Sequence, residues 1–185
     1  MLLDEYSHYL DKDNKIRSLV KSEDLIRLTK GIYETDKNTP GYVLAGAIYG
    51  PSYLSFDYAL SYYGLIPEAV YTYTSATFQK GKVKQYKNYF GNYTYRDIPS
   101  LAFPFEVRLI QEGAYLYKIA SPEKALCDKL YSLSPVANKK ELNKLLFDDL
   151  RIDEDEFAKL DKAVLVELCD LYKSTNLKLL KKVVK

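Results

Sequence analysis

The chain has 185 residues, 47% hydrophobic and 28% charged, and its 27 Lys and Arg against 25 Asp and Glu leave a net charge of +2. This length fits one domain, or one domain with a small appendage, and the composition is that of a globular protein, not a disordered one. The charge balance excludes a polycation that coats nucleic acid by bulk charge, although it allows a local basic face.

The sequence also limits which metal sites the protein can have and in which cellular compartment we expect it. One histidine (His8) and two cysteines without a CxxC pair (Cys127 and Cys169) exclude a His-rich or CxxC metal centre. Residues 1–10 lack the basic start and apolar run of a signal peptide, and no stretch approaches the roughly 18 apolar residues of a membrane span. Cysteines in apolar helical patterns fit a reducing cytoplasm, where we expect the protein to act.

The N-terminal segment reads as a small separate unit. Periodicity predicts helices over 2–10 and 13–22, the second capped by Asp13 or Asn14. Two apolar runs around a Gly-containing turn predict a β-hairpin over 25–34. The polar loop 36–40 then marks a boundary, which gives units 1–38 and 39–185.

The middle of the chain changes from helical to strand periodicity. Short helices are expected over 42–49 and over 56–63, with Tyr53-Leu54 extended between them and Ser55 as an N-cap. After them, alternation predicts about five strands, mostly antiparallel. They fall at 69–78, in a hairpin over 86–98, and at 105–111 and 115–120.

The last third is predicted to be helical. Ser121 and Pro122 open a helix over 121–133, whose apolar stripe is Ala125, Leu126, Leu130 and Leu133. Further helices are expected over 139–150, from Asp153 and Glu156 to about Tyr172, and over 176–185. The fold class is therefore α+β, with a truncated winged-helix-like N-terminal unit, a mostly antiparallel central sheet and a helical C-terminal third.

Signals for catalysis are weak. The chain has no GxxxxGK[ST], GxGxxG or GxSxG motif, and Gly41, Gly46 and Gly50 have the wrong spacing for a phosphate loop. The acidic run 153–156 is explained by a helix start and not by Mg²⁺, and Cys127 is predicted to lie in the core. We therefore expect no enzyme, no cofactor and no metal.

Two basic features remain as candidate binding sites. Residues 69–96 contain five cations and eight aromatic residues but no Asp or Glu. Positive charge among π-faces suits an acidic partner surface or nucleic acid, whereas a solvated hairpin with ordinary lysines is the alternative. The candidate partner-binding residues are Lys80, Lys82, Lys84, Tyr86, Lys87, Tyr89 and Arg96. If 80–84 is extended, its three lysines share one face.

The second basic feature is the helix and hairpin over 13–34. A basic helix followed by a hairpin has the geometry of a winged helix, in which the helix enters the major groove and the wing touches phosphate. The alternative is a small structural cap, favoured by the acids that cancel part of the charge. The candidate DNA-binding residues are Lys15, Arg17, Lys21, Arg27 and Lys30.

Three segments resemble a known family. LIRLTKGIYE (25–34), the segment from Pro51 to Thr77, and NYTYRDIP (92–99) with IASPEKALCDKLY (119–131) are similar to AbiEi-type antitoxins of bacterial abortive-infection systems. The resemblance implies a phage-defence protein that neutralises a cognate nucleotidyltransferase-like toxin encoded beside it. It also implies a winged helix that binds operator DNA and represses the operon, with the antitoxin activity in the second domain.

One departure from the family pattern matters. A complete winged helix has three helices before its wing, and only 24 residues precede Leu25. The DNA-binding unit is therefore expected to be incomplete, which affects a repressor role more than an antitoxin role. We expect an antitoxin without a membrane partner; the alternative is a dedicated DNA-binding repressor.

Overall fold

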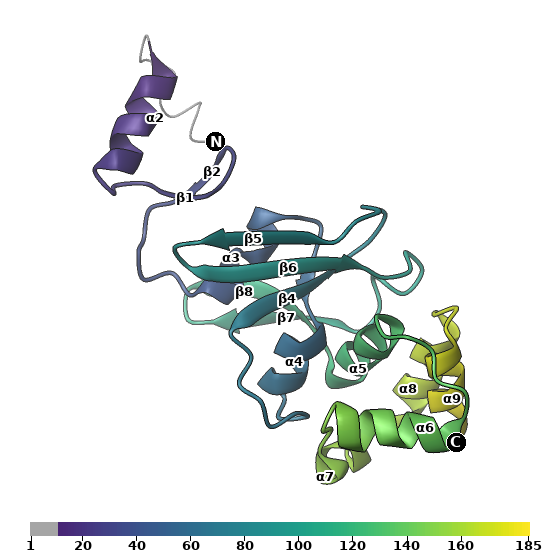
Figure 1. The fold of residues 1–185 in the computed structure, drawn as a ribbon. Helices are drawn as coiled ribbons and strands as arrows, with labels where there is room; N and C mark the ends of the chain where they lie inside the picture. Colours follow the sequence, from purple (N-terminus) through teal and green to yellow (C-terminus); the bar gives the residue numbers. More distant parts are fainter. Residues whose placement is uncertain (1–10) are drawn as a thin grey trace.

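A computed structural model describes residues 11–185 (Figure 1). The expected helix over 2–10 and His8 lie outside the described residues. A helix and hairpin stand at one end of the molecule, a six-stranded sheet occupies the middle, and helices form the C-terminal third. The predicted α+β class and the order of its three parts are confirmed.

The N-terminal unit consists of α2 (Lys12–Lys21) and the antiparallel pair β1 (Ile26–Thr29) and β2 (Ile32–Glu34). Asp11 caps α2, because its Oδ1 accepts a hydrogen bond from the backbone N–H of Asn14 at 3.0 Å, so the predicted caps Asp13 and Asn14 are wrong. The hairpin adjoins the sheet at β5, where Asn88 Nδ2 donates to the carbonyl of Leu28 at 3.3 Å.

The central sheet has the strand order β5-β6-β4-β3-β8-β7. Its strands are β3 (Tyr53–Leu54), β4 (Thr72–Thr77), β5 (Lys84–Asn88), β6 (Gly91–Asp97), β7 (Val107–Glu112) and β8 (Tyr115–Ala120). Three pairings are antiparallel, while β3 with β8 and β4 with β6 are parallel, so the sheet is mixed. The sixth strand is the extended piece Tyr53-Leu54, which joins the two halves of the sheet.

Helices cover both faces of the sheet. Helix α3 (Gly41–Ile48) packs on one face, where Tyr93 and Tyr95 donate their hydroxyls to the carbonyls of Gly41 and Ala45 at 3.0 and 2.7 Å. Thr94 lies between these two tyrosines on β6, so its side chain points to the other face of the sheet, and it pairs with Thr74. Helix α4 (Phe56–Tyr62) lies on that opposite face, since the N–H of Tyr58 donates to Thr74 Oγ1.

The C-terminal third surrounds α5 (Pro122–Tyr131), which Ser121 caps as predicted. The other helices are α6 (Lys139–Asn143), α7 (Glu154–Ala158), α8 (Lys162–Asp170) and α9 (Thr175–Val184). The leucines that they turn inward, such as Leu142, Leu165 and Leu177, are fully or almost fully buried. None of the helices in residues 11–185 is long and apolar enough to cross a membrane.

Two predicted C-terminal helices differ from the structure. The helix over 139–150 turns π-helical over Lys144–Asp149. The helix expected to run from Asp153 to about Tyr172 is two helices, because Asp161 accepts from the N–H groups of Ala163 and Val164 and so caps α8. A second N-cap within the apolar pattern thus ends the continuous helix that periodicity predicts.

Candidate interaction surfaces

The acid-free stretch 69–96 forms β4, β5 and β6, yet only part of its aromatic content is accessible. Tyr93 and Tyr95 are fully buried beneath α3, so they hold the fold and offer no stacking surface. Tyr86 packs half-buried against the ring of Tyr49 at 5.9 Å. Tyr71 and Tyr89 are 84% and 67% exposed. The sequence pattern therefore overstates the aromatic surface.

Lys80 and Lys82 belong to a loop and Lys84 begins β5, so the three lysines do not share one strand face. Gly81 has φ +70° and β5 begins only at Lys84, so 80–83 is not extended and the condition for a shared lysine face is not met. The carboxylate of Asp97 accepts from the backbone N–H groups of Lys80 and Gly81 at 2.7 Å each and fixes the loop. Lys80 Nζ donates to the carbonyl of Gly50 and lies over the ring of Tyr49. Lys82 is exposed at the loop tip.

The remaining candidate residues lie on two faces of the sheet. Lys84 and Tyr86 lie on the face that carries α3, because Lys84 pairs with Tyr95 and Tyr86 with Tyr93. Lys87 and Arg96 lie on the opposite face, which is open over β5 and β6. A shallow hollow of about 400 Å³ over these strands is lined by Thr72, Gln85, Lys87, Asn92 and Thr94, together with Tyr86 and Tyr93. This open face is cationic and rich in hydrogen-bonding groups.

The candidate DNA-binding residues are not gathered on one surface of α2. Arg17 and Lys21 are one turn apart and exposed, whereas Lys15 is two residues from Arg17 and so points to another side of the helix. Arg27 and Lys30 are exposed on the hairpin, where Arg27 Nε donates to the carbonyl of Thr29 at 3.4 Å. A further cation of the unit, Lys37, is paired with Glu23.

A buried ionic network that no sequence motif predicts is centred on α5. Lys124 and Asp128 are fully buried, with 3.1 Å between Nζ and Oδ1. Tyr172 contacts Lys124 Nζ and donates its hydroxyl to Asp128 Oδ1. Tyr53 and Ser55 donate to Asp128 Oδ2 at 3.0 and 2.7 Å. The sequence shows only the Lys-x-x-x-Asp spacing, which by itself is typical of a solvated helix face.

The electrostatics of this network are those of a structural element. Burial lowers the pKa of Lys124, and the charge of Asp128 opposes that effect. Burial is also the main cause that raises the pKa of Tyr53 and of Tyr172. The carboxylate receives donors on both oxygens, so the network is satisfied internally and joins β3, α5 and the end of α8.

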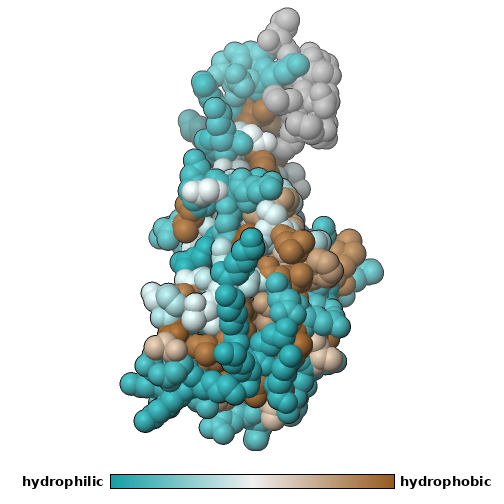
Figure 2. Space-filling model, turned by 90° about the vertical axis from the view of Figure 1, so that its right-hand side faces the viewer, coloured by the Kyte–Doolittle hydropathy of each residue, from teal (hydrophilic) through white to brown (hydrophobic). Residues whose placement is uncertain are grey.

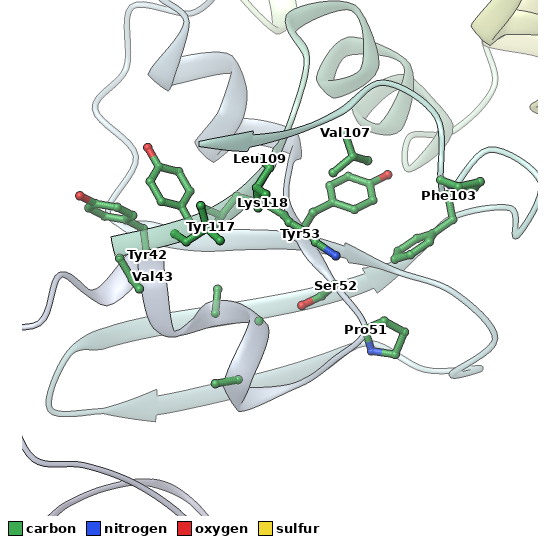
Figure 3. Close-up of a pocket in the computed structure, with 16 residues that line it drawn as sticks. Tyr42, Val43, Pro51, Ser52, Tyr53, Phe103, Val107, Leu109, Tyr117 and Lys118 are labelled. Carbon is green, nitrogen blue, oxygen red and sulfur yellow. The ribbon is translucent and has the colours of Figure 1, made fainter. Parts of the chain in front are cut away.

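An apolar groove beside α3 also went unpredicted. Its volume is about 680 Å³, and it is lined by Val43 and Ala47 of α3, by Phe103, and by Leu109, Leu116 and Lys118 of β7 and β8 (Figure 3). Leu109 and Leu116 are 58% and 56% exposed. Hydrophobic side chains reach the surface at mid-height of the molecule, between largely hydrophilic ends (Figure 2).

Two further sequence interpretations can be placed in the structure. Cys127 is fully buried, as predicted, and faces the buried thiol of Cys169. The acids 153–156 form the start of α7, where Asp153 Oδ1 accepts from the N–H of Glu156 at 2.9 Å. Within residues 11–185 no group of His, Cys, Asp and Glu is arranged to hold a metal ion.

Comparison of the chain with protein-family models found no match, and comparison with curated proteins found none either.

Proposed function

We propose that this protein is a cytoplasmic, non-enzymatic antitoxin that neutralises a nucleotidyltransferase-like toxin encoded beside it. The proposal rests on the sequence resemblance to AbiEi-type antitoxins. It is supported by where the resembling segments lie in the fold and by the surface next to them.

The observation that carries the proposal is that the resembling segments, far apart in sequence, meet through their own polar residues. Ser55, from the segment Pro51 to Thr77, donates to Asp128 of the segment 119–131 at 2.7 Å. Thr77 of the first segment donates to Asp97 of the segment 92–99 at 2.6 Å. The similar residues thus include those that hold the sheet and α5 together, as expected when similarity reflects a shared fold rather than shared composition.

A surface suited to an acidic partner adjoins these segments. The open face of β5 and β6 carries Lys87 and Arg96, and neither forms an ion pair within the part of the chain that is described. Uncompensated charge of one sign steers a partner of the other sign and adds specificity on contact. We assign this face, with Lys82 at the adjoining loop tip, as the toxin-facing surface.

The alternative function is a DNA-binding repressor that acts through the N-terminal unit. The exposed side chains of Arg17 and Lys21 on α2 and of Lys30 on the hairpin favour it. Only one helix precedes the hairpin among residues 11–185, and its first turn carries Asp13 beside the cap Asp11. These acids reduce the attraction to phosphate, so this role is secondary in our proposal.

Co-expression tests the proposal directly. The neighbouring toxin is induced alone, with the full chain, and with a chain carrying Lys82→Glu, Lys87→Glu and Arg96→Glu. Growth restored by the full chain supports the antitoxin role. Toxicity that persists despite a folded, abundant full chain contradicts it, and operator binding without growth rescue favours the repressor instead.

A further inference from the structure

One end of the sheet is a strand whose outer edge has no partner strand among residues 11–185. Strand β7 is the last in the order β5-β6-β4-β3-β8-β7, and within residues 11–185 it pairs with β8 alone. The carbonyl of Glu106 accepts from the N–H of Ser121, so even-numbered residues turn their backbone groups toward β8. Those of Val107, Leu109 and Gln111 therefore point away from the sheet. A row of free donors and acceptors of this kind is a template for another strand.

The other edge of the sheet, strand β5, is less suited to the addition of a strand. Strand β5 carries Lys84 and Lys87, and edge lysines oppose strand addition. The β1–β2 hairpin also adjoins it, where Asn88 binds the carbonyl of Leu28. By contrast, β7 presents Leu109, 58% exposed, next to the apolar groove. Strand addition at β7 would cover hydrophobic side chains that the monomer leaves in water.

We propose that β7 pairs antiparallel with β7 of a second copy of this chain, centred on Ile110, to form a twofold dimer with a continuous sheet. This inference does not depend on the antitoxin role. The register is selected by charge, because centring on Ile110 places Arg108 opposite Glu112 of the other copy, twice by symmetry. Centring one residue earlier, on Leu109, would instead place Glu106 opposite Glu112.

The same register satisfies the backbone and the side chains. Leu109 lies opposite Gln111 of the other copy, and both have outward backbone groups, so they form a hydrogen-bonded pair. Ile110 meets its own counterpart in a close non-hydrogen-bonded pair, and such β-branched pairs stabilise sheets. On the groove face, the exposed Leu109 side chains of the two copies become diagonal neighbours, with Leu116 one strand further out.

The charged residues of β7 are available for this contact. Arg108 forms no ion pair within residues 11–185 and lies over the ring of Tyr63 at 5.7 Å. One carboxylate oxygen of Glu112 accepts from Tyr42 and Tyr117 at 2.9 and 3.3 Å. Its second oxygen remains for a guanidinium. A second copy is thus favoured over an unrelated strand, because β7 carries the charges that complement its own.

Sedimentation of the full chain over a concentration series tests the proposal. The wild type is expected to dimerise, and Arg108→Glu or Glu112→Arg alone to raise the dimer Kd about tenfold or more, because each puts two like-charge pairs across the interface. Mixing the two variants restores complementary pairs and should give a heterodimer by native mass spectrometry. Lys87→Glu, the same charge change on β5, should leave the Kd unchanged.

A backbone variant makes the test independent of Glu112, whose replacement also removes the two tyrosine hydrogen bonds. Gln111→Pro deletes an outward N–H and leaves the bonds to β8 intact, so it should abolish dimerisation, whereas Gln111→Ala should not. A wild type that stays monomeric at every concentration overturns the proposal. So does a dimer that tolerates Gln111→Pro, or one that the mixed charge variants fail to restore.

Discussion

Lys124 and Asp128 lie one turn apart on α5 and form an ion pair with no solvent exposure on either side chain. The two ends of the pair are supported unequally. Asp128 also receives the hydroxyls of Tyr172, Tyr53 and Ser55. Within residues 11–185, the oxygen of Tyr172 is the one hydrogen-bond partner of Lys124 besides the carboxylate, and the ammonium also lies over the rings of Tyr53 and Tyr172. Because Asp128 has more hydrogen-bond partners than Lys124, we expect the two residues to differ in how much stability their replacement costs.

Asp128→Ala is therefore expected to be more damaging than Lys124→Met. The first leaves a buried ammonium without its counterion, which costs about 3–5 kcal/mol. The second leaves the Asp128 carboxylate with its three hydroxyl donors. The methionine side chain, which is apolar and similar in length to lysine, fills the space of the lysine side chain. Urea unfolding of both variants measures the difference. If Lys124→Met destabilises the protein as much as Asp128→Ala, the proposed inequality of support is wrong.

Leu126→Ala should destabilise the protein by about 2–5 kcal/mol, although Leu126 touches no candidate surface. Its side chain is fully buried, as the predicted apolar stripe of α5 requires, so truncation leaves a cavity. Leu101→Ala is the matched control, because that leucine is 65% exposed. Thermal unfolding should show a large fall in Tm for the first variant and little change for the second.

Stability should fall as the pH rises above about 10. Burial raises the pKa of Tyr53, Tyr93, Tyr95 and Tyr172 above the ordinary tyrosine value. The unfolded chain therefore loses these protons first, and each such group lowers the free energy of unfolding by up to about 1.4 kcal/mol per pH unit above 10. The lowered pKa of Lys124 acts in the opposite direction, but it is a single group.

Tyr95→Phe isolates one contribution to this alkaline loss. Its hydroxyl donates to the carbonyl of Ala45 at 2.7 Å, so the variant should be less stable at pH 8 yet lose stability less steeply above pH 10. Denaturant unfolding from pH 8 to 11 gives both values. Tyr71→Phe, at a side chain 84% exposed, should change neither, and an unchanged slope for Tyr95→Phe would refute the assignment.

DNA binding, where it occurs, should be weak and electrostatic. Replacing Lys15, Arg17 and Lys21 by Ala should abolish it at physiological salt. Where binding is still measurable at low salt, the slope of log affinity against log salt should fall by about 2–3 as phosphate contacts are lost. Lys37→Ala is a useful control, because Lys37 is paired with Glu23 at 2.6 Å. Tight operator binding that survives the triple replacement would remove α2 from the interface.

Local signals in the sequence predict most elements but not what covers them. Ser121 and Pro122 define the start of α5, and alternation defines the strands, because both effects act within a few residues. Alternation does not show which face of β6 is covered. The sequence therefore does not reveal that Tyr93 and Tyr95 are buried beneath α3.

The same limit applies to the buried charges of α5. A Lys-x-x-x-Asp pair normally marks a solvated helix face. Here α5 is enclosed on that side too, because Tyr53 and Tyr172 reach it from segments about 75 and 44 residues away in sequence. Only tertiary packing reveals that the face is buried. The groove beside α3 is a further case, because it forms where this short helix leaves part of β7 and β8 uncovered.

The final prediction separates the two cationic faces of the residues 69–96. Lys80 is tied to the carbonyl of Gly50, so reversing Lys80, Lys82 and Lys84 together would disturb the loop as well as the charge. Lys87→Glu with Arg96→Glu changes only the open face, where both side chains are exposed. We expect this variant to lose rescue from the toxin while its Tm stays near that of the wild type.

The control carries the same change of net charge elsewhere. Lys173→Glu with Lys178→Glu alters two exposed lysines of the C-terminal third, so it should retain full rescue if a local positive face, rather than total charge, attracts the toxin. Equal loss in both variants would point to net charge alone. Full rescue by Lys87→Glu with Arg96→Glu would assign these cations to solubility and move the toxin-facing surface to the helices that follow Ser121.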